Sequence, residues 1–355
     1  MKAFIALKDK ILSGERISEN DALMLLEWPI PILGALANHR RQLIHPEETV
    51  GFILDRIVNF TNICEAKCKF CAFHARGGVI PSYELSIDEV LDKIGEMSLA
   101  GGTQVMLQGG LHPEYDIEFY EKLIRSVKER FPNVYLHSFS PAEVVHMSKK
   151  SNITIEEAVS RLKAAGLDSI PGASDLLVDR IRKIVSPLKA TKDEWCRVIR
   201  ALAANSMGST ATMTYGMDET LEERIDHLKV IRDIQDETGI LRAFIPWSFS
   251  PEKTAMERIT PATGIDYLKI VAISRIYLDN IKYIHAGWLT EGVAIAQVAL
   301  SMGANDFGGV IMEELVVKAT GIKNTTNMEE IIALIKQAGK IPVLRDSVYR
   351  ELQRF

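Results

Sequence analysis

Three of the four cysteines in this 355-residue chain lie close together, with the spacing C-x3-C-x2-C. They are Cys64, Cys68 and Cys71, while Cys196 lies far along the chain in a helix-like stretch. Because a structural zinc site normally takes four protein ligands and a 4Fe-4S cluster has four corners, three thiolates suit a cluster with one iron open to a small molecule. The spacing therefore predicts a catalytic iron-sulfur cluster. A zinc knuckle, a ferredoxin-like electron carrier and three unrelated buried thiols are the alternatives.

The cysteine loop, with Phe70 directly before its last cysteine, resembles the signature of the radical S-adenosylmethionine (SAM) superfamily. The resemblance implies a 4Fe-4S cluster whose open iron binds the amino and carboxylate groups of SAM. It also implies an electron donor such as flavodoxin or ferredoxin, and cleavage of SAM to methionine and a 5′-deoxyadenosyl radical. We expect Phe70 to pack on the adenine of SAM; the alternative is that it shields the cluster from solvent.

Short apolar segments that alternate with capped helices must position this loop. The predicted strands cover residues 50–58, 104–108, 134–139, 168–170, 209–215, 243–249, 283–287 and 306–310. Ser/Thr-x-x-Glu/Asp capping boxes begin the helices between them at Ser86, Thr154, Thr191, Thr220 and Thr263. Eight strand-helix units predict an α/β fold, a TIM-type (β/α)8 barrel. An open doubly wound sheet is the alternative, although no G-x-G-x-x-G follows the first strand.

The pattern divides the chain into three parts. Residues 1–48 are expected to form an N-terminal helical extension, residues 49–320 the barrel, and residues 321–355 a C-terminal helical segment packed on the barrel. In such barrels the chemistry takes place at the C-terminal ends of the strands. The cysteine loop follows the first strand, so the other strand ends should surround it.

Small and polar residues at those strand ends are candidates for binding SAM. Gly109 and Gly110 resemble the glycine motif that binds the SAM amino group in relatives, with Gln108 beside them, and Ser140 matches a serine that contacts SAM. A tight strand-to-helix turn is the alternative explanation of the two glycines. Trp195 occupies a region where some relatives place an arginine near SAM.

Other strand-end residues are candidates for the substrate and for catalysis. His74 and Arg76 follow the cluster loop, and Thr212, Trp247 and Phe249 would line a lumen suited to a partly aromatic, partly hydroxylated substrate. Asp175 and Glu219 are acids that can bind hydroxyls or transfer a proton. For each of these residues a structural or solvated role is the alternative.

The resemblance extends from about residue 50 to residue 320 and is greatest to the menaquinone- and deazaflavin-pathway group, in particular the dehypoxanthine futalosine cyclases. It is carried by segments such as LHSFSPAEVVHMSK and FIPWSFSP. It implies that the radical abstracts a ribose hydrogen from dehypoxanthine futalosine, and that the carbon radical attacks the benzoate ring to give cyclic dehypoxanthine futalosine. Segments 171–175 and 216–219 depart from the family pattern. A paralogue acting on another aromatic or nucleoside substrate is therefore one alternative. A non-catalytic iron-sulfur protein is a second, separate alternative.

Composition limits the setting. A net charge of −5 gives no reason to expect nucleic acid as a partner, and no apolar run reaches the roughly 18 residues of a membrane span. Few cysteines outside the cluster argue against a secreted disulfide framework. We therefore expect a cytoplasmic enzyme with a small-molecule substrate.

Overall fold

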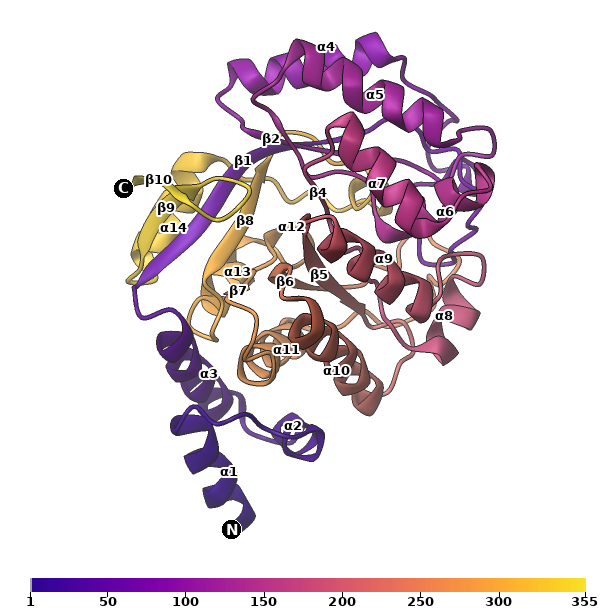
Figure 1. Cartoon of the computed structure of the whole chain (residues 1–355). Coiled ribbons are helices and arrows are strands. Elements are labelled where there is room, and N and C mark those ends of the chain that lie inside the picture. Colours follow the sequence, from indigo (N-terminus) through magenta and orange to yellow (C-terminus); the bar gives the residue numbers. More distant parts are fainter. Residues whose placement is uncertain (1) are drawn as a thin grey trace.

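Eight parallel strands, each followed by at least one helix, form a TIM-type barrel in this computed structural model, which describes residues 2–355 (Figure 1). The strands are β1 (Thr49–Asn59), β2 (Gln104–Gln108), β3 (Tyr135–Leu136), β4 (Ser169–Ile170), β5 (Gly208–Tyr215), β6 (Leu241–Ser248), β7 (Tyr283–Ile284) and β8 (Asp306–Ile311). All eight coincide with predicted strands, and β3, β4 and β7 are shorter than predicted.

The strand order closes on itself. One group of paired strands contains β8, β1, β2 and β3 in that order, and the other contains β4, β5, β6 and β7 in that order. Single bridges between His137 and Ser169 and between His285 and Asp306 join these two groups. Because β8 returns to β1, the alternative of an open doubly wound sheet is wrong.

The helices cover the outside of the barrel. Those between the strands are α4 (Ile87–Leu99), α5 (Ile117–Arg130), α6 (Pro141–Lys150), α7 (Ile155–Ala165), α8 (Asp179–Val185), α9 (Lys192–Ala204), α10 (Leu221–Thr238), α11 (Gly264–Tyr277), α12 (Trp288–Glu291) and α13 (Val293–Ala299). Reciprocal capping boxes begin α4, α9, α10 and α11 at the predicted positions, and Thr154 caps α7 through its hydroxyl.

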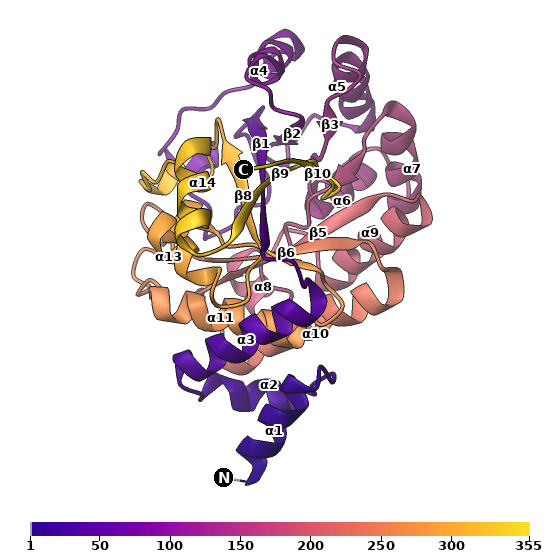
Figure 2. The same cartoon turned by 90° about the vertical axis from the view of Figure 1, so that its left-hand side faces the viewer.

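Three helices precede the barrel: α1 (Lys2–Leu12), α2 (Glu19–Leu26) and α3 (Ile30–Ile44). They lie together at one end of the molecule, next to α10 and α11 (Figure 2). Arg232 on α10 donates to the carbonyl of Ile17 at 2.8 Å, and Lys269 on α11 donates to the carbonyl of Leu26 at 2.9 Å. These bonds fasten the extension to the outer helices.

The C-terminal segment differs from the helical prediction. It contains α14 (Met328–Gln337), followed by β9 (Ile341–Arg345) and β10 (Glu351–Arg354). β9 runs parallel to residues 49–52 at the start of β1, and β10 pairs antiparallel with β9. The start of β1 extends beyond β2, which leaves backbone groups that β9 satisfies.

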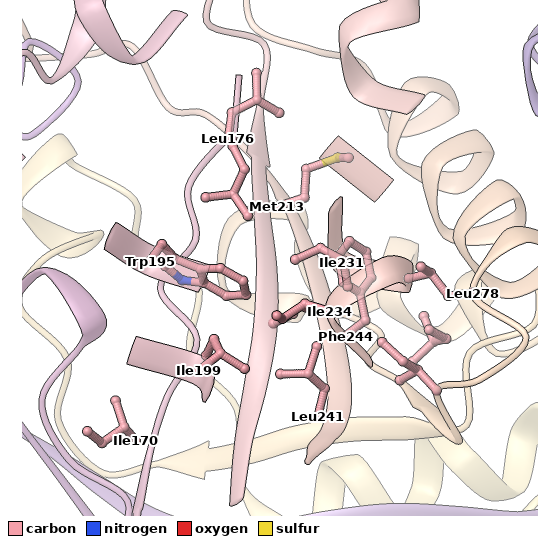
Figure 3. Close-up of a cluster of buried hydrophobic side chains, with 14 of the residues drawn as sticks. Ile170, Leu176, Trp195, Ile199, Met213, Ile231, Ile234, Leu241, Phe244 and Leu278 are labelled. Atoms are coloured by element: carbon pink, nitrogen blue, oxygen red, sulfur yellow. The ribbon is translucent and has the colours of Figure 1, made fainter. Parts of the chain in front are cut away.

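Apolar side chains between the strands and the outer helices form the main core. Figure 3 shows the part around β5 and β6, where Met213, Phe244 and Leu241 point outward from the barrel and meet Ile231, Ile234 and Trp195 from the helices. This packing fixes which residues of each strand face the lumen. No helix within residues 2–355 is long and apolar enough to cross a membrane.

Candidate active site

The cysteine loop lies over one cavity that runs through the barrel lumen, with a volume of about 410 Å³. All three clustered cysteines line it. So do ten of the other predicted site residues: Phe70, His74, Gln108, Gly109, Gly110, Ser140, Asp175, Thr212, Trp247 and Phe249. The residues come from six strand ends and their loops, as the barrel prediction requires.

The two glycines after β2 let that strand end approach the cysteine loop. A Cβ at Gly110 would lie 2.1 Å from the carbonyl oxygen of Ile63, and one at Gly109 would lie 2.6 Å from the ring of Phe60. Directly after them, the backbone N–H of Leu111 donates to the sulfur of Cys64 at 3.3 Å. Both glycines are therefore required by packing, and both also face the cavity.

The three thiols are free and close enough to influence one another's charge. Burial raises the pKa of Cys68 to about 12, and Lys189 opposes that shift. Within residues 2–355 no three His, Cys, Asp or Glu side chains are grouped tightly enough to hold a single metal ion. The thiolates of an iron-sulfur cluster bind different iron atoms, and a bound metal deprotonates its thiols. The donor set thus fits a cluster with three protein ligands.

A buried carboxyl, Glu143, lies beside Ser140 at the end of β3. The Ser140 hydroxyl donates to Glu143 at 2.6 Å, and the N–H of Gly109 donates to its other oxygen at 3.1 Å. Burial raises the pKa of Glu143 to about 7. Sequence reasoning missed this residue because Ser140-Pro-Ala-Glu143 also has the spacing of an ordinary helix cap.

Asp175 pairs with Lys189, a second residue that sequence reasoning missed. Their side chains are 2.6 Å apart, and the Lys189 ammonium lies 5.6 Å from the centre of the Phe70 ring. Burial lowers the pKa of Lys189, but Asp175 and Cys68 raise it more, so the net shift is upward. A fixed cation therefore lies next to the cysteine loop. No motif indicated it, since Lys189 sits in the short loop before α9.

The loop after β4, which departs from the family pattern, is held tightly. A Cβ at Gly172 would lie 2.1 Å from the carbonyl oxygen of Thr210, and Ala173 and Asp175 have φ values of 36° and 48°. Such left-handed residues store strain that their surroundings must support. Here Thr212 accepts the N–H of Ser174 at 2.8 Å.

The structure places three predicted site residues away from the cavity. Arg76 is exposed on the outside of the cysteine loop. Trp195 is fully buried in the core, where its indole N–H donates to the carbonyl of Gly172 at 2.7 Å, so it positions the β4 loop (Figure 3). Glu219 accepts the N–H groups of Gly216 and Met217, each at 2.7 Å, and pairs with Arg224. Its carboxylate closes a turn on the outside of the lumen.

The aromatic and hydroxyl groups of β5 and β6 meet at the lumen wall. Trp247 donates from its indole N–H to the hydroxyl of Thr214 at 2.7 Å, and Phe249 is buried. His74 has a buried Nδ1 with no hydrogen-bond partner among residues 2–355, and burial lowers its pKa. Aromatic rings and hydroxyl groups thus line one space.

Barrel and cysteine loop together define a radical SAM enzyme. Residues 58–231 match the radical SAM superfamily, and residues 237–354 match the CofH/MqnC C-terminal region. Methylornithine synthase (PylB) shares the fold, with a TM-score of 0.75 and 17% identity, covering 95% of this chain and 97% of that chain. The hydrogenase maturase HydG from Carboxydothermus hydrogenoformans shares it too, with a TM-score of 0.77 and 16% identity, covering 97% of this chain and 80% of that chain.

Full-length relatives specify the family. Cyclic dehypoxanthine futalosine synthase of Halalkalibacterium halodurans is 42% identical, covering 98% of this chain and 94% of that protein. The protein of the same name from Streptomyces coelicolor is 41% identical, with coverage of 97% and 88%. A 5-amino-6-(D-ribitylamino)uracil--L-tyrosine 4-hydroxyphenyl transferase 1 of Methanosarcina acetivorans is 40% identical, with coverage of 95% and 92%. The chain belongs to the CofH/MqnC family of radical SAM enzymes.

Proposed function

We propose that the chain converts dehypoxanthine futalosine to cyclic dehypoxanthine futalosine, the product for which its relatives at 41% and 42% identity are named. The observation that carries this proposal is the single lumen beneath the cysteine loop, which combines aromatic walls with hydroxyl and amide groups. A carbon radical on the ribose must be held against an aromatic ring of the same molecule. Orientation of that kind supplies much of the rate of an intramolecular addition.

Named residues would hold the cofactors. Cys64, Cys68 and Cys71 would bind a 4Fe-4S cluster, and Phe70, Gln108, Gly109, Gly110 and Ser140 would contact SAM. When bound, SAM and the cluster supply a 5′-deoxyadenosyl radical. The Lys189 ammonium, although paired with Asp175, keeps further N–H groups that would donate to SAM, and Glu143 offers a hydrogen-bonding carboxyl. An electron donor such as flavodoxin or ferredoxin would reduce the cluster from outside.

The substrate would lie deeper, against Thr212, Trp247 and Phe249, with His74 near the mouth. These walls would exclude water from the radical and hold the ribose against the ring. Asp175 would be the candidate to accept the proton released when the ring regains aromaticity, and the oxidised iron-sulfur cluster would be the acceptor for the electron released with it. Its pairing with Lys189 keeps its carboxylate fixed at the cavity wall.

Anaerobic reconstitution tests the proposal. With SAM, dithionite and dehypoxanthine futalosine, we expect 5′-deoxyadenosine and a product that has lost two hydrogen atoms, detected by mass spectrometry. Cys68→Ala should abolish both, because the cluster loses a ligand. Cys196→Ala, which changes a thiol outside the cavity, is the matched control and should retain both. Cleavage of SAM with unchanged dehypoxanthine futalosine would contradict the proposed substrate.

A second candidate function is tested in the same assay. The Methanosarcina relative covers nearly the whole chain at 40% identity, and its name specifies tyrosine and 5-amino-6-(D-ribitylamino)uracil. The changed loop at residues 171–175 lies at the cavity, which favours testing this pair. A joined product from these two compounds, with none from dehypoxanthine futalosine, would support the transferase function.

A further inference from the structure

The deep end of the lumen, opposite the cysteine loop, is polar. The strands send alternate side chains inward, and several of the inward residues there carry hydrogen-bonding groups. They include Asp55, Gln104, His137, Arg242, His285 and Arg345. A barrel floor that served packing alone would be filled with branched apolar side chains. The polar floor therefore requires a separate explanation.

Most charges at the cavity wall are already compensated. Arg345 pairs with Asp306, with one N–O distance of 2.8 Å, and Lys189 pairs with Asp175. Glu314 accepts three backbone N–H groups. The side chains of His137 and His285 are neutral near pH 7, because burial lowers their pKa values to about 3 and about 4.

Arg242 is different. It has no carboxylate within 4.0 Å among residues 2–355, although it lines the cavity. Its Nη1 donates to the hydroxyl of Tyr135 at 2.9 Å and to the carbonyl of Ser347 at 3.3 Å, which fixes the guanidinium at the floor. Nε and Nη2, which make no hydrogen bond, are not among the buried atoms without a partner. These two nitrogens form the edge with which arginine binds a carboxylate through two parallel hydrogen bonds.

The neighbours of Arg242 fit the same ligand. A Cβ at Gly208 would lie 2.2 Å from Nη2, so only glycine leaves room for the guanidinium there. His137 lies nearby, since the charge of Arg242 helps to lower its pKa, and its Nδ1 is engaged by the Ser169 hydroxyl at 2.7 Å. Its other ring nitrogen makes no protein hydrogen bond and can face a ligand. Asp55, another acid of the floor, already accepts a hydrogen bond from Gln104 at 3.2 Å. Arg242, a fixed cation without a paired carboxylate and with the neutral His137 nearby, therefore suits one carboxylate from a ligand.

We propose that the deep end of the lumen is a substrate subsite in which Arg242 binds a carboxylate, with His137 beside it. Arg242 is the second residue of β6, six residues before the strand ends under the cofactor side, which is roughly 20 Å along the strand. The acid of the substrate therefore points toward the floor, with the reacting ring between Arg242 and the cysteine loop. The inference rests on the proposed function only for the identity of that molecule, whose benzoate would be the acid bound.

Binding of benzoate and benzamide to the reconstituted enzyme, measured by saturation-transfer NMR, tests the subsite without turnover. Benzoate should bind at least about tenfold more tightly than benzamide, because only the carboxylate can accept both hydrogen bonds with a charge. Arg242→Gln should weaken benzoate binding by about tenfold or more, and Arg242→Lys by less. Arg200→Gln, which changes an arginine paired with Glu237 on the outside of α9, is the matched control and should leave binding unchanged.

Equal binding of benzoate and benzamide, or equal benzoate binding by wild type and Arg242→Gln, would overturn the subsite. The comparison of benzoate with benzamide uses the wild-type protein alone, so it tests the subsite even if the Arg242 variants do not fold. Turnover then separates the two proposals. Arg242-dependent benzoate binding without conversion of dehypoxanthine futalosine would remove the proposed function and keep the subsite. Conversion of dehypoxanthine futalosine and its carboxamide analogue with the same KM would remove the subsite and keep the proposed function.

Discussion

Burial in the barrel lumen changes the pKa values of two carboxyl groups. Burial raises the pKa values of Asp55 and Glu143 to about 7 each. For Asp55, Arg345 and a hydrogen bond from Gln104 at 3.2 Å oppose the shift, while Asp306 adds to it. Glycine at position 309 makes room for this carboxyl, since a Cβ there would lie 2.2 Å from Oδ1. The floor thus holds an acid that is partly protonated near neutral pH.

The pH dependence of stability tests the protonation of Asp55. Its pKa is about 7 in the folded chain and 3.8 in the reference state, so the folded state binds more protons between these values. The stabilisation that protonated Asp55 contributes to the folded chain is full below about pH 4 and is lost as the pH rises through 7. Asp55→Asn cannot ionise. From pH 5 to pH 8 its free energy of unfolding should therefore gain about 1–3 kcal/mol relative to wild type.

Urea unfolding of the metal-free proteins across this pH range is the measurement. Asp88→Asn, which changes an exposed acid in the first turn of α4, is the matched control. Its curve should run parallel to that of wild type. If the Asp55→Asn curve is equally parallel, the carboxyl is ionised throughout and the inferred protonation is wrong.

Among the elements, β9 and β10 show what local patterns leave out. The strands and capped helices of the barrel follow from alternation and from boxes such as Thr220 with Glu223, which are local signals. The pairing of β9 with β1 joins residues almost 300 positions apart, and nothing near Ile341 indicates it. The same holds for the site. The cysteine loop and Gly109-Gly110 are visible as motifs, whereas Lys189 reaches the cavity only through the fold.

The β9 strand contributes a buried ion pair that closes the barrel floor. Arg345 and Asp306 have side-chain exposures of 6% and 0% and are joined by two hydrogen bonds. Arg345→Met would leave Asp306 buried without its partner, and should lower the free energy of unfolding by about 3–5 kcal/mol at pH 7. Urea unfolding measures the change.

Arg354→Met on β10 is the matched control, because that arginine makes exposed ion pairs with Glu351 and Glu47. It should have little effect. A loss below about 1 kcal/mol for Arg345→Met would show that water reaches Asp306 and replaces the ion pair.

At the scale of the whole molecule, the outer wall of the barrel depends on the N-terminal helices. α11 is buried over nearly its full length, with its inner side on the barrel and its outer side against α2 and α3 (Figure 1). Leu25, Leu33 and Leu36 supply apolar contact from the extension. Arg16 adds ion pairs with Asp236 and Asp279. The extension therefore completes the outer layer of the barrel.

Removal of residues 1–47 tests this dependence. The deletion would expose the apolar outer side of α11, and a contiguous patch of that kind promotes association. We expect a lower thermal midpoint and oligomers or aggregates in size-exclusion chromatography with light scattering. Removal of residues 2–12 alone is the matched control, because it takes away α1 but leaves α2 and α3 in place. A shortened protein that elutes as wild type does and melts at the same temperature would show that α11 needs no cover, and that the barrel is stable without the three helices.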